Sequence, residues 1–157
     1  MAGDMVNRFR HAARLSLVVA ILLVPGFALG ALGEDEASVQ ADGVRLKGAA
    51  SVRYAQHYAL HEIVQPGGTA VREYVSPAGK VFAVAWQGPV IPDLRQVLGA
   101  HFDRYVAAAR DKRVKRTPVV IREPSLVVVT WGHMRAFSGR AYVPAMVPQG
   151  VDPEALQ

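Results

Sequence analysis

The 157-residue sequence contains no cysteine, no internal repeat and no low-complexity segment. The lack of cysteine excludes a disulfide framework and a lipid-modified cysteine at a cleavage site. The lack of repeats excludes a solenoid or an array. Hydrophobic residues make up 51% of the chain and charged residues 20%. This balance is typical of a globular domain that is held together by its apolar core alone.

The N-terminal segment has the composition of an export signal. Its opening carries three basic residues: Arg8, Arg10 and Arg14. The run Leu15–Leu29 is almost wholly apolar, is interrupted by Pro25 and ends in small residues. It is shorter than the roughly 20 residues that cross a bilayer. We therefore predict a signal peptide over residues 1–30, cleaved after Gly30 or alternatively after Gly33; an uncleaved membrane anchor is the other interpretation.

Cleavage leaves residues 31–157, which suffice for one domain and are too few for two. The formal net charge of +5 includes the basic residues of the signal peptide, so the mature chain is less basic. We expect a periplasmic or secreted protein that meets the membrane only transiently, through its signal peptide. Export and this modest charge argue against a nucleic-acid partner.

The middle of the sequence predicts an antiparallel meander of three strands. They are expected at 58–64, 69–75 and 80–86, joined by tight turns that contain Pro66 and Pro77. The third strand has no polar alternation, so both of its faces should be covered. Residues 34–53 are expected to form a short helix followed by a flexible stretch.

A helix with one apolar stripe is predicted from Pro92 to Arg110, because apolar residues recur there at intervals of three and four. Two or three further strands are expected within residues 118–143. The fold class is therefore α+β: an antiparallel sheet, built from the meander and the C-terminal strands, packed by one amphipathic helix.

Five sequence runs carry a resemblance to a known family. They are Val71–Val75, Gly79–Pro89, Pro92–Leu94, Leu98–Gly99 with Phe102, and Gly132–Gly139. Together they resemble domain of unknown function 2844, a family of small exported proteins of Gram-negative bacteria. The resemblance covers about residues 31–157. It implies an exported protein and brings no activity, cofactor or catalytic residue with it.

A metal site is one candidate among the polar residues. His57 and His61 are four positions apart and Glu62 follows, so the two imidazoles would share one face of a helix or a strand. A third imidazole, from His101 or His133, could join them only through folding. The alternative is a pair of surface histidines at the sheet edge.

An anion site is the second candidate, within the glycine-flanked segment 132–140. It combines four polar residues: His133, Arg135, Ser138 and Arg140. The arginines could bind a carboxylate or phosphate in a bidentate manner. A Ser138–His133 nucleophile is conceivable, although the Gly-x-Ser-x-Gly elbow is absent. The alternative is a glycine-shaped turn with solvated arginines.

Three other features are assigned to structure rather than to function. The basic cluster within residues 110–116 is interpreted as a solvated connector, although it could attract anionic lipid. Trp86 is interpreted as a core residue. His101 interrupts the helical stripe and is expected to be half-buried.

The sequence supports three functional hypotheses. The leading one is a non-enzymatic domain of the envelope or secreted fraction, without a cofactor, that binds an envelope protein or a small anionic ligand. The alternative is a small hydrolase, metal-dependent or anion-binding. The third is a structural or assembly protein that acts through a sheet edge.

Overall fold

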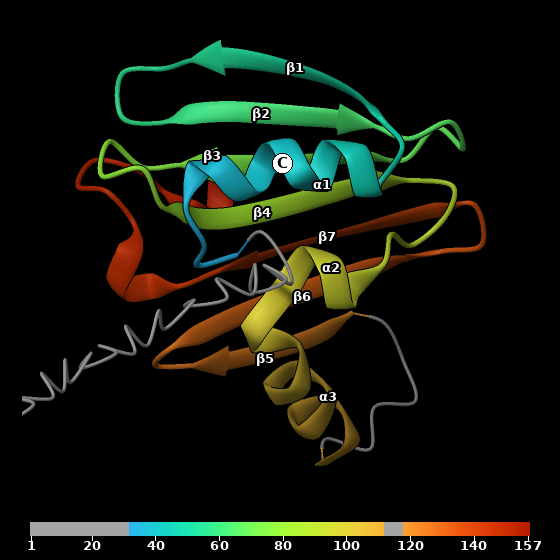
Figure 1. Ribbon diagram of the computed structural model, residues 1–157. Coiled ribbons are helices and arrows are strands. Elements are labelled where there is room, and N and C mark those ends of the chain that lie inside the picture. Colours follow the sequence, from blue (N-terminus) through green and yellow to red (C-terminus); the bar gives the residue numbers. More distant parts are fainter. Residues whose placement is uncertain (1–31, 112–117) are drawn as a thin grey trace, which may run out of the picture.

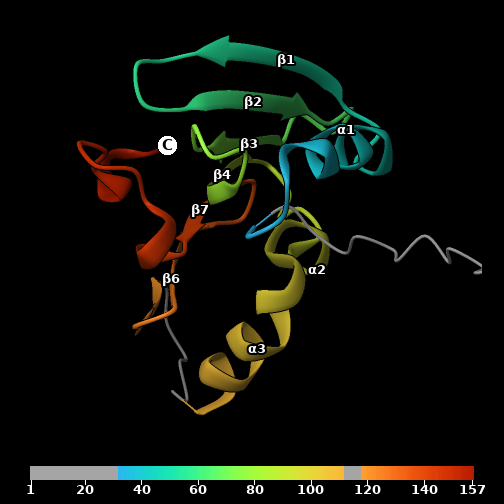
Figure 2. The same cartoon turned by 60° about the vertical axis from the view of Figure 1, so that its left-hand side comes forward.

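The computed structural model describes residues 32–111 and 118–157. The predicted signal peptide and most of the predicted basic connector lie outside these ranges. A seven-stranded antiparallel sheet forms the centre of the molecule (Figure 1). All helices longer than one turn in the described ranges lie on one face of the sheet, and the C-terminal segment crosses the other face (Figure 2).

The sheet has the order β1-β2-β3-β4-β7-β6-β5. Its strands are β1 (Ala49–Tyr54), β2 (Ala59–Val64), β3 (Ala70–Val75), β4 (Val81–Gly88), β5 (Val119–Glu123), β6 (Leu126–His133) and β7 (Ala136–Tyr142). The predicted α+β class, with an antiparallel sheet and a meander, is confirmed. The meander has four strands rather than three, and a second meander of three strands joins it where β4 pairs with β7.

The central strand β4 explains the absence of polar alternation in its sequence. Residues Val81 to Trp86 are all buried, because helices cover one side of the strand and the C-terminal segment covers the other. The register between β3 and β4 shifts at Tyr74 and Val75. This irregularity turns Phe82 toward the aromatic cluster that it forms with Tyr58 and Tyr74.

The predicted helix over residues 92–110 forms as three successive pieces. They are α2 (Leu94–Leu98), the 3-10 turn η1 (Gly99–His101) and α3 (Phe102–Asp111). Asp93 begins α2 by accepting hydrogen bonds from the backbone N–H groups of Arg95 and Gln96 at 2.9 and 3.4 Å. Gly99 has a φ of +51°, so the apolar stripe continues while the helix axis is interrupted.

The expectation for residues 34–53 is half correct. The helix α1 (Glu36–Arg45) forms and buries Val39 against the sheet. The stretch after it is the edge strand β1 rather than a flexible segment, and all six of its residues are exposed. A strand without a buried face has no hydrophobic alternation, so its sequence carries no periodic signal.

The two faces of the sheet have separate apolar cores. On the helix face, which α1, α2 and α3 cover, the core includes Leu32, Ile63, Trp86, Leu98 and Ile121. On the opposite face the tail, defined as residues 143–157, packs Leu156 against Tyr74, Phe82 and Tyr142. We call this the tail face. None of the helices described is both long and apolar enough to cross a membrane.

Candidate functional site

The tail is fixed to the sheet by two polar anchors. The hydroxyl of Tyr74 donates a hydrogen bond to the backbone carbonyl of Gln157 at 2.6 Å. Glu154, in the short 3-10 turn η3 (Pro153–Ala155), accepts hydrogen bonds from Arg122 at 2.8 Å, from Tyr142 at 2.9 Å and from Arg140. The two anchors therefore tie the tail to β3, β5 and β7.

The hydrogen bonds to Glu154 have a clear electrostatic effect. Arg122 makes the largest contribution, followed by Tyr142, and together with Arg140 they lower the pKa of Glu154 to about 2. Glu154 is therefore ionised at neutral pH. Its two arginine partners outnumber it, so this cluster keeps a net positive charge.

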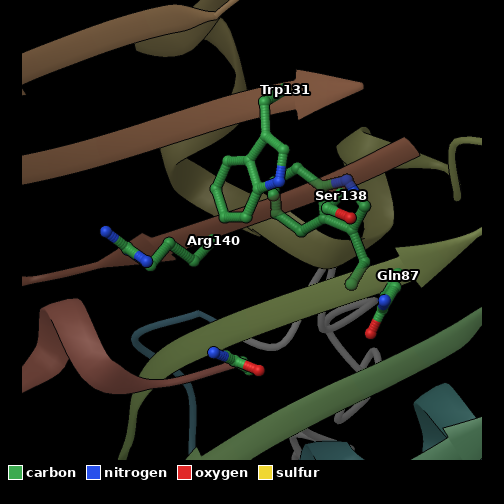
Figure 3. A pocket seen from close by; sticks show the side chains of 7 residues that line it. Gln87, Trp131, Ser138 and Arg140 are labelled. Atoms are coloured by element: carbon green, nitrogen blue, oxygen red, sulfur yellow. The ribbon is translucent and has the colours of Figure 1, made fainter. Parts of the chain in front are cut away.

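A hollow of about 220 Å³ lies beside this cluster. We call it the Trp131 hollow. Its lining consists of Trp86, Gln87, Trp131, Ser138, Gly139, Arg140 and Gln157. Figure 3 shows four of these side chains grouped around it: Gln87 of β4, Trp131 of β6, and Ser138 and Arg140 of β7.

The strand register explains why these side chains meet. Gln87 is paired with Ser138, and Ser138 with Trp131, so these three side chains form one row across three strands. Arg140, two positions further along β7, shares their face. Its guanidinium carbon lies 5.5 Å from the centroid of the Trp131 ring, within the range of a cation–π interaction.

The hollow combines an exposed ring with hydrogen-bonding groups. The Trp131 residue is 38% exposed. Glu154 accepts from the Nη2 atom of Arg140, while the Nε atom of Arg140 has no hydrogen-bond partner within the described part of the chain. This arrangement can stack a planar or apolar group on the indole and donate hydrogen bonds to an acidic or polar group beside it.

The other two residues of the predicted anion site lie further out. Arg135 is in the turn between β6 and β7 with a φ of +66°, and it lines a neighbouring hollow together with Gln87, Phe137 and Ser138. His133 ends β6 and lines none of these hollows. No hydrogen bond joins His133 to Ser138 among the residues described. The structure thus brings together Ser138 and Arg140, with Arg135 nearby.

The three residues of the predicted metal site are not brought together. His57 lies before β2, near Gly150 of the tail. His61 is on the helix face, where its Nε2 atom lies 3.3 Å from a carboxylate oxygen of Glu36. Glu62 is on the tail face and forms ion pairs with Arg72 and Arg53 at 2.7 and 3.5 Å.

The expectation that His57 and His61 share a face is wrong, because β2 begins only at Ala59. His101 is elsewhere again, beside Gly33. Within residues 32–111 and 118–157, no group of three or more His, Asp or Glu side chains is arranged to hold a metal ion.

Comparison of the sequence with models of protein families identifies the family of this chain. The family model described as "Protein of unknown function (DUF2844)" matches residues 28–156. The chain belongs to this family. No curated protein and no solved structure matches it. The match spans all strands of the described sheet and the tail as far as Leu156, so every lining residue of the Trp131 hollow except Gln157 lies within the DUF2844 domain.

Sequence reasoning missed several residues of the hollow in this DUF2844 domain. Gln87 and Gln157 are distant from Ser138 in the sequence and reach it only through the sheet register and the course of the tail. Trp131 was not among the site residues predicted from the sequence. An aromatic side chain near the exposed end of a strand, close to two arginines, is the one signal that could have identified it.

A second polar cluster of the DUF2844 domain is buried between α1 and the sheet. It consists of Ser38, Asp42, His61 and Glu73. Burial, with a smaller contribution from the charge of Asp42, raises the pKa of Glu73 to about 8. Burial also raises the pKa of Asp42. Glu73 is only 1% exposed, so this cluster cannot contact a ligand in solution and is a structural feature.

Proposed function

We propose that the protein is an exported, non-enzymatic binding domain, and that the Trp131 hollow holds a small ligand with a planar or apolar part and an anionic group. The observation that carries the proposal is the row of Gln87, Ser138 and Trp131 with Arg140 beside the indole ring. Binding sites commonly combine a small number of placed polar groups with an aromatic surface.

The charges of the tail face support an anionic ligand. The face carries two triplets, each with one glutamate between two arginines: Arg53–Glu62–Arg72 and Arg122–Glu154–Arg140. Each triplet therefore has a net charge of about +1 at neutral pH, since arginine stays protonated. A positive face favours the approach of an anion to the hollow.

The proposed export has separate support. The apolar run 15–29 follows three arginines, and the family match begins at residue 28, close to the proposed cleavage after Gly30. Intact-mass analysis of the protein from its native cells tests this part. We expect the mass of residues 31–157, and the full-length chain in the cytosol would contradict export.

Tryptophan fluorescence tests the binding proposal, because the chain has only two tryptophans. Both tryptophans line the hollow, but Trp86 is 2% exposed and Trp131 is 38% exposed, so a ligand in the hollow should alter mainly the emission of Trp131. The probes are benzoate, inorganic phosphate and inorganic polyphosphate. We expect at least one of them to change the emission of the wild-type protein and to leave that of Trp131→Phe unchanged.

The matched variants separate the hollow from general charge. Arg140→Ala should weaken binding about tenfold or more, because a charge-assisted hydrogen bond contributes about 1.5–3 kcal/mol. Arg72→Ala removes an arginine from the other triplet and should change the affinity little. Arg135→Ala combined with Arg140→Ala should abolish binding. Equal losses from Arg72→Ala and Arg140→Ala, or no response to any probe, would contradict the proposal.

A further inference from the structure

The strand β1 forms an outer edge of the sheet. It pairs with β2 on one side and has no strand on the other in the described structure. All six of its residues, Ala49–Tyr54, are exposed. Figures 1 and 2 show that neither α1 nor the tail covers its outer side.

The direction of the backbone groups along this edge follows from the turn that ends β1. The N–H group of Ala55 donates to the carbonyl of Tyr58 at 2.9 Å, so this pair is a hydrogen-bonded pair. Such pairs alternate along an antiparallel ladder. The backbone N–H and C=O groups of Ala50, Val52 and Tyr54 therefore point away from β2, along the free edge.

In the described structure this edge has few of the features that usually prevent strand pairing. Those features are proline, charged side chains, a bulge or a covering segment. The β1 sequence, Ala-Ala-Ser-Val-Arg-Tyr, contains no proline, and its one charged residue, Arg53, forms an ion pair with Glu62 of β2 at 3.5 Å. Its six pairs with β2 are in continuous register. Val52 is 46% exposed and Tyr54 is 82% exposed, so apolar groups accompany the free hydrogen-bonding groups.

We propose that β1 pairs antiparallel with β1 of a second copy of this chain, about a two-fold axis at Val52. Val52 then lies opposite Val52, and Ala50 lies opposite Tyr54. The three residues with outward backbone groups exchange all of their N–H and C=O groups with the second copy. The two sheets become one continuous sheet, and the helices of both copies lie on the same face.

Charge selects this register among the neighbouring ones. With the axis at Val52, Arg53 lies opposite Ser51, and Arg53 keeps its ion pair with Glu62 of its own chain at 3.5 Å. An axis at Arg53 would place two arginines directly opposite each other, which is unfavourable. An axis at Ser51 would need the N–H of Gly48, which already donates to Gly43 at 3.2 Å.

The register also covers exposed apolar side chains. Tyr54 of the second copy would lie beside Ala50, and Ala50 is next to α1, where a Cβ on Gly43 would be 3.7 Å from its own. Val44, which follows Gly43 on α1, is 79% exposed. Each Tyr54 ring therefore has an apolar partner in the other copy, and this contact favours a second copy over an unrelated peptide.

Cysteine crosslinking tests the register directly, because the chain has no cysteine of its own. Opposite residues of a hydrogen-bonded pair have Cα atoms about 5.5 Å apart, within the range that a disulfide requires. Val52→Cys should form a disulfide-linked dimer under mild oxidation. Ser51→Cys alone and Arg53→Cys alone should not, whereas a mixture of these two variants should crosslink. Val90→Cys, at an exposed residue after β4, is the control for random collisions.

Sedimentation analysis tests the dimer without crosslinking. Val52→Lys places two ammonium groups opposite each other and should weaken self-association about tenfold or more. Val90→Lys makes the same change at a residue that is 61% exposed and lies after β4, away from the edge, and should retain the dimer. A wild-type protein that stays monomeric up to about 1 mM, or equal crosslinking of Val52→Cys and Val90→Cys, would overturn the proposal. Capture of a different protein by β1 with no self-association would also overturn it.

Discussion

Replacing Glu73 with glutamine tests how the helix α1 is held on the sheet. The Glu73 side chain lies on the helix face of β3, and neither of its carboxylate oxygens has a hydrogen-bond partner. The polar groups around it are His61, its neighbour on β2, and Asp42 of α1, to which Gln96 of α2 donates a hydrogen bond at 3.3 Å. None of these groups donates a hydrogen bond to Glu73.

The expected change in the free energy of unfolding follows from the pKa of Glu73, which burial raises from 4.5 to about 8. The folded protein binds this proton more tightly than the unfolded chain, so the contribution of Glu73 to stability is greatest below pH 4.5 and is lost as the pH rises toward 8. The free energy of unfolding falls by about 1.4 kcal/mol per pH unit in this range. The loss is therefore about 3 kcal/mol at pH 7 and about 5 kcal/mol over the whole range from pH 4.5 to 8. Glutamine carries no ionisable proton, so Glu73→Gln should escape this loss.

Urea unfolding at a series of pH values measures the effect. We expect Glu73→Gln and the wild type to have similar free energies of unfolding near pH 4, and the variant to be more stable by about 3 kcal/mol at pH 7. Asp103→Asn, at a side chain that is 90% exposed, is the control and should follow the wild type within about 0.5 kcal/mol. A difference between Glu73→Gln and wild type that does not vary with pH would refute the reasoning.

Three further predictions concern the tail, the sheet and metal content. Glu154→Gln should accelerate amide exchange in residues 143–157 at neutral pH. Arg122 and its neighbours lower the pKa of Glu154 to about 2. The difference in exchange rate between Glu154→Gln and the wild type should therefore disappear as the pH falls from 4.5 toward 2. Gly139→Ala should destabilise the fold by about 1–3 kcal/mol in urea unfolding, because its Cβ would clash with the Trp86 ring. Gly67→Ala, where a Cβ meets nothing within 4 Å, should not destabilise the fold comparably. Elemental analysis of protein purified without chelator should find no stoichiometric metal, and one bound zinc would restore the hydrolase hypothesis.

The elements that the sequence predicts correctly are those that bury a face. The strand β4 is apolar throughout because both of its sides are covered. The turns with Pro66 and Pro77 mark the two ends of its neighbour β3. The strand β1 was missed for the opposite reason: without a buried face it shows no hydrophobic period, and its position is determined by hydrogen bonds to β2.

The candidate site was predictable only in part, because it depends on register. Ser138 and Arg140 are two positions apart on one strand, so it could be inferred from the sequence that they share a face. The addition of Gln87 depends on the pairing of β4 with β7, which lie far apart in the chain. The course of the tail, which adds Gln157 and Glu154, leaves no periodic pattern in the sequence.

The hollow and the free edge together predict a response to ligand length. A two-fold axis through Val52 runs perpendicular to the sheet, so both Trp131 hollows of the dimer open on the same side, on the order of 40 Å apart by strand spacing. A polyanion long enough to span them should bind the dimer about a hundredfold more tightly than the monomer, because its second contact is intramolecular.

Titration with short and long inorganic polyphosphate separates the two proposals. Val52→Lys should reduce the affinity for long chains and leave that for short chains unchanged, whereas Arg140→Ala should weaken both. Equal weakening of both lengths by Val52→Lys would show that β1 belongs to the binding site itself. If long and short chains bind the wild-type protein equally well, the two hollows do not act together.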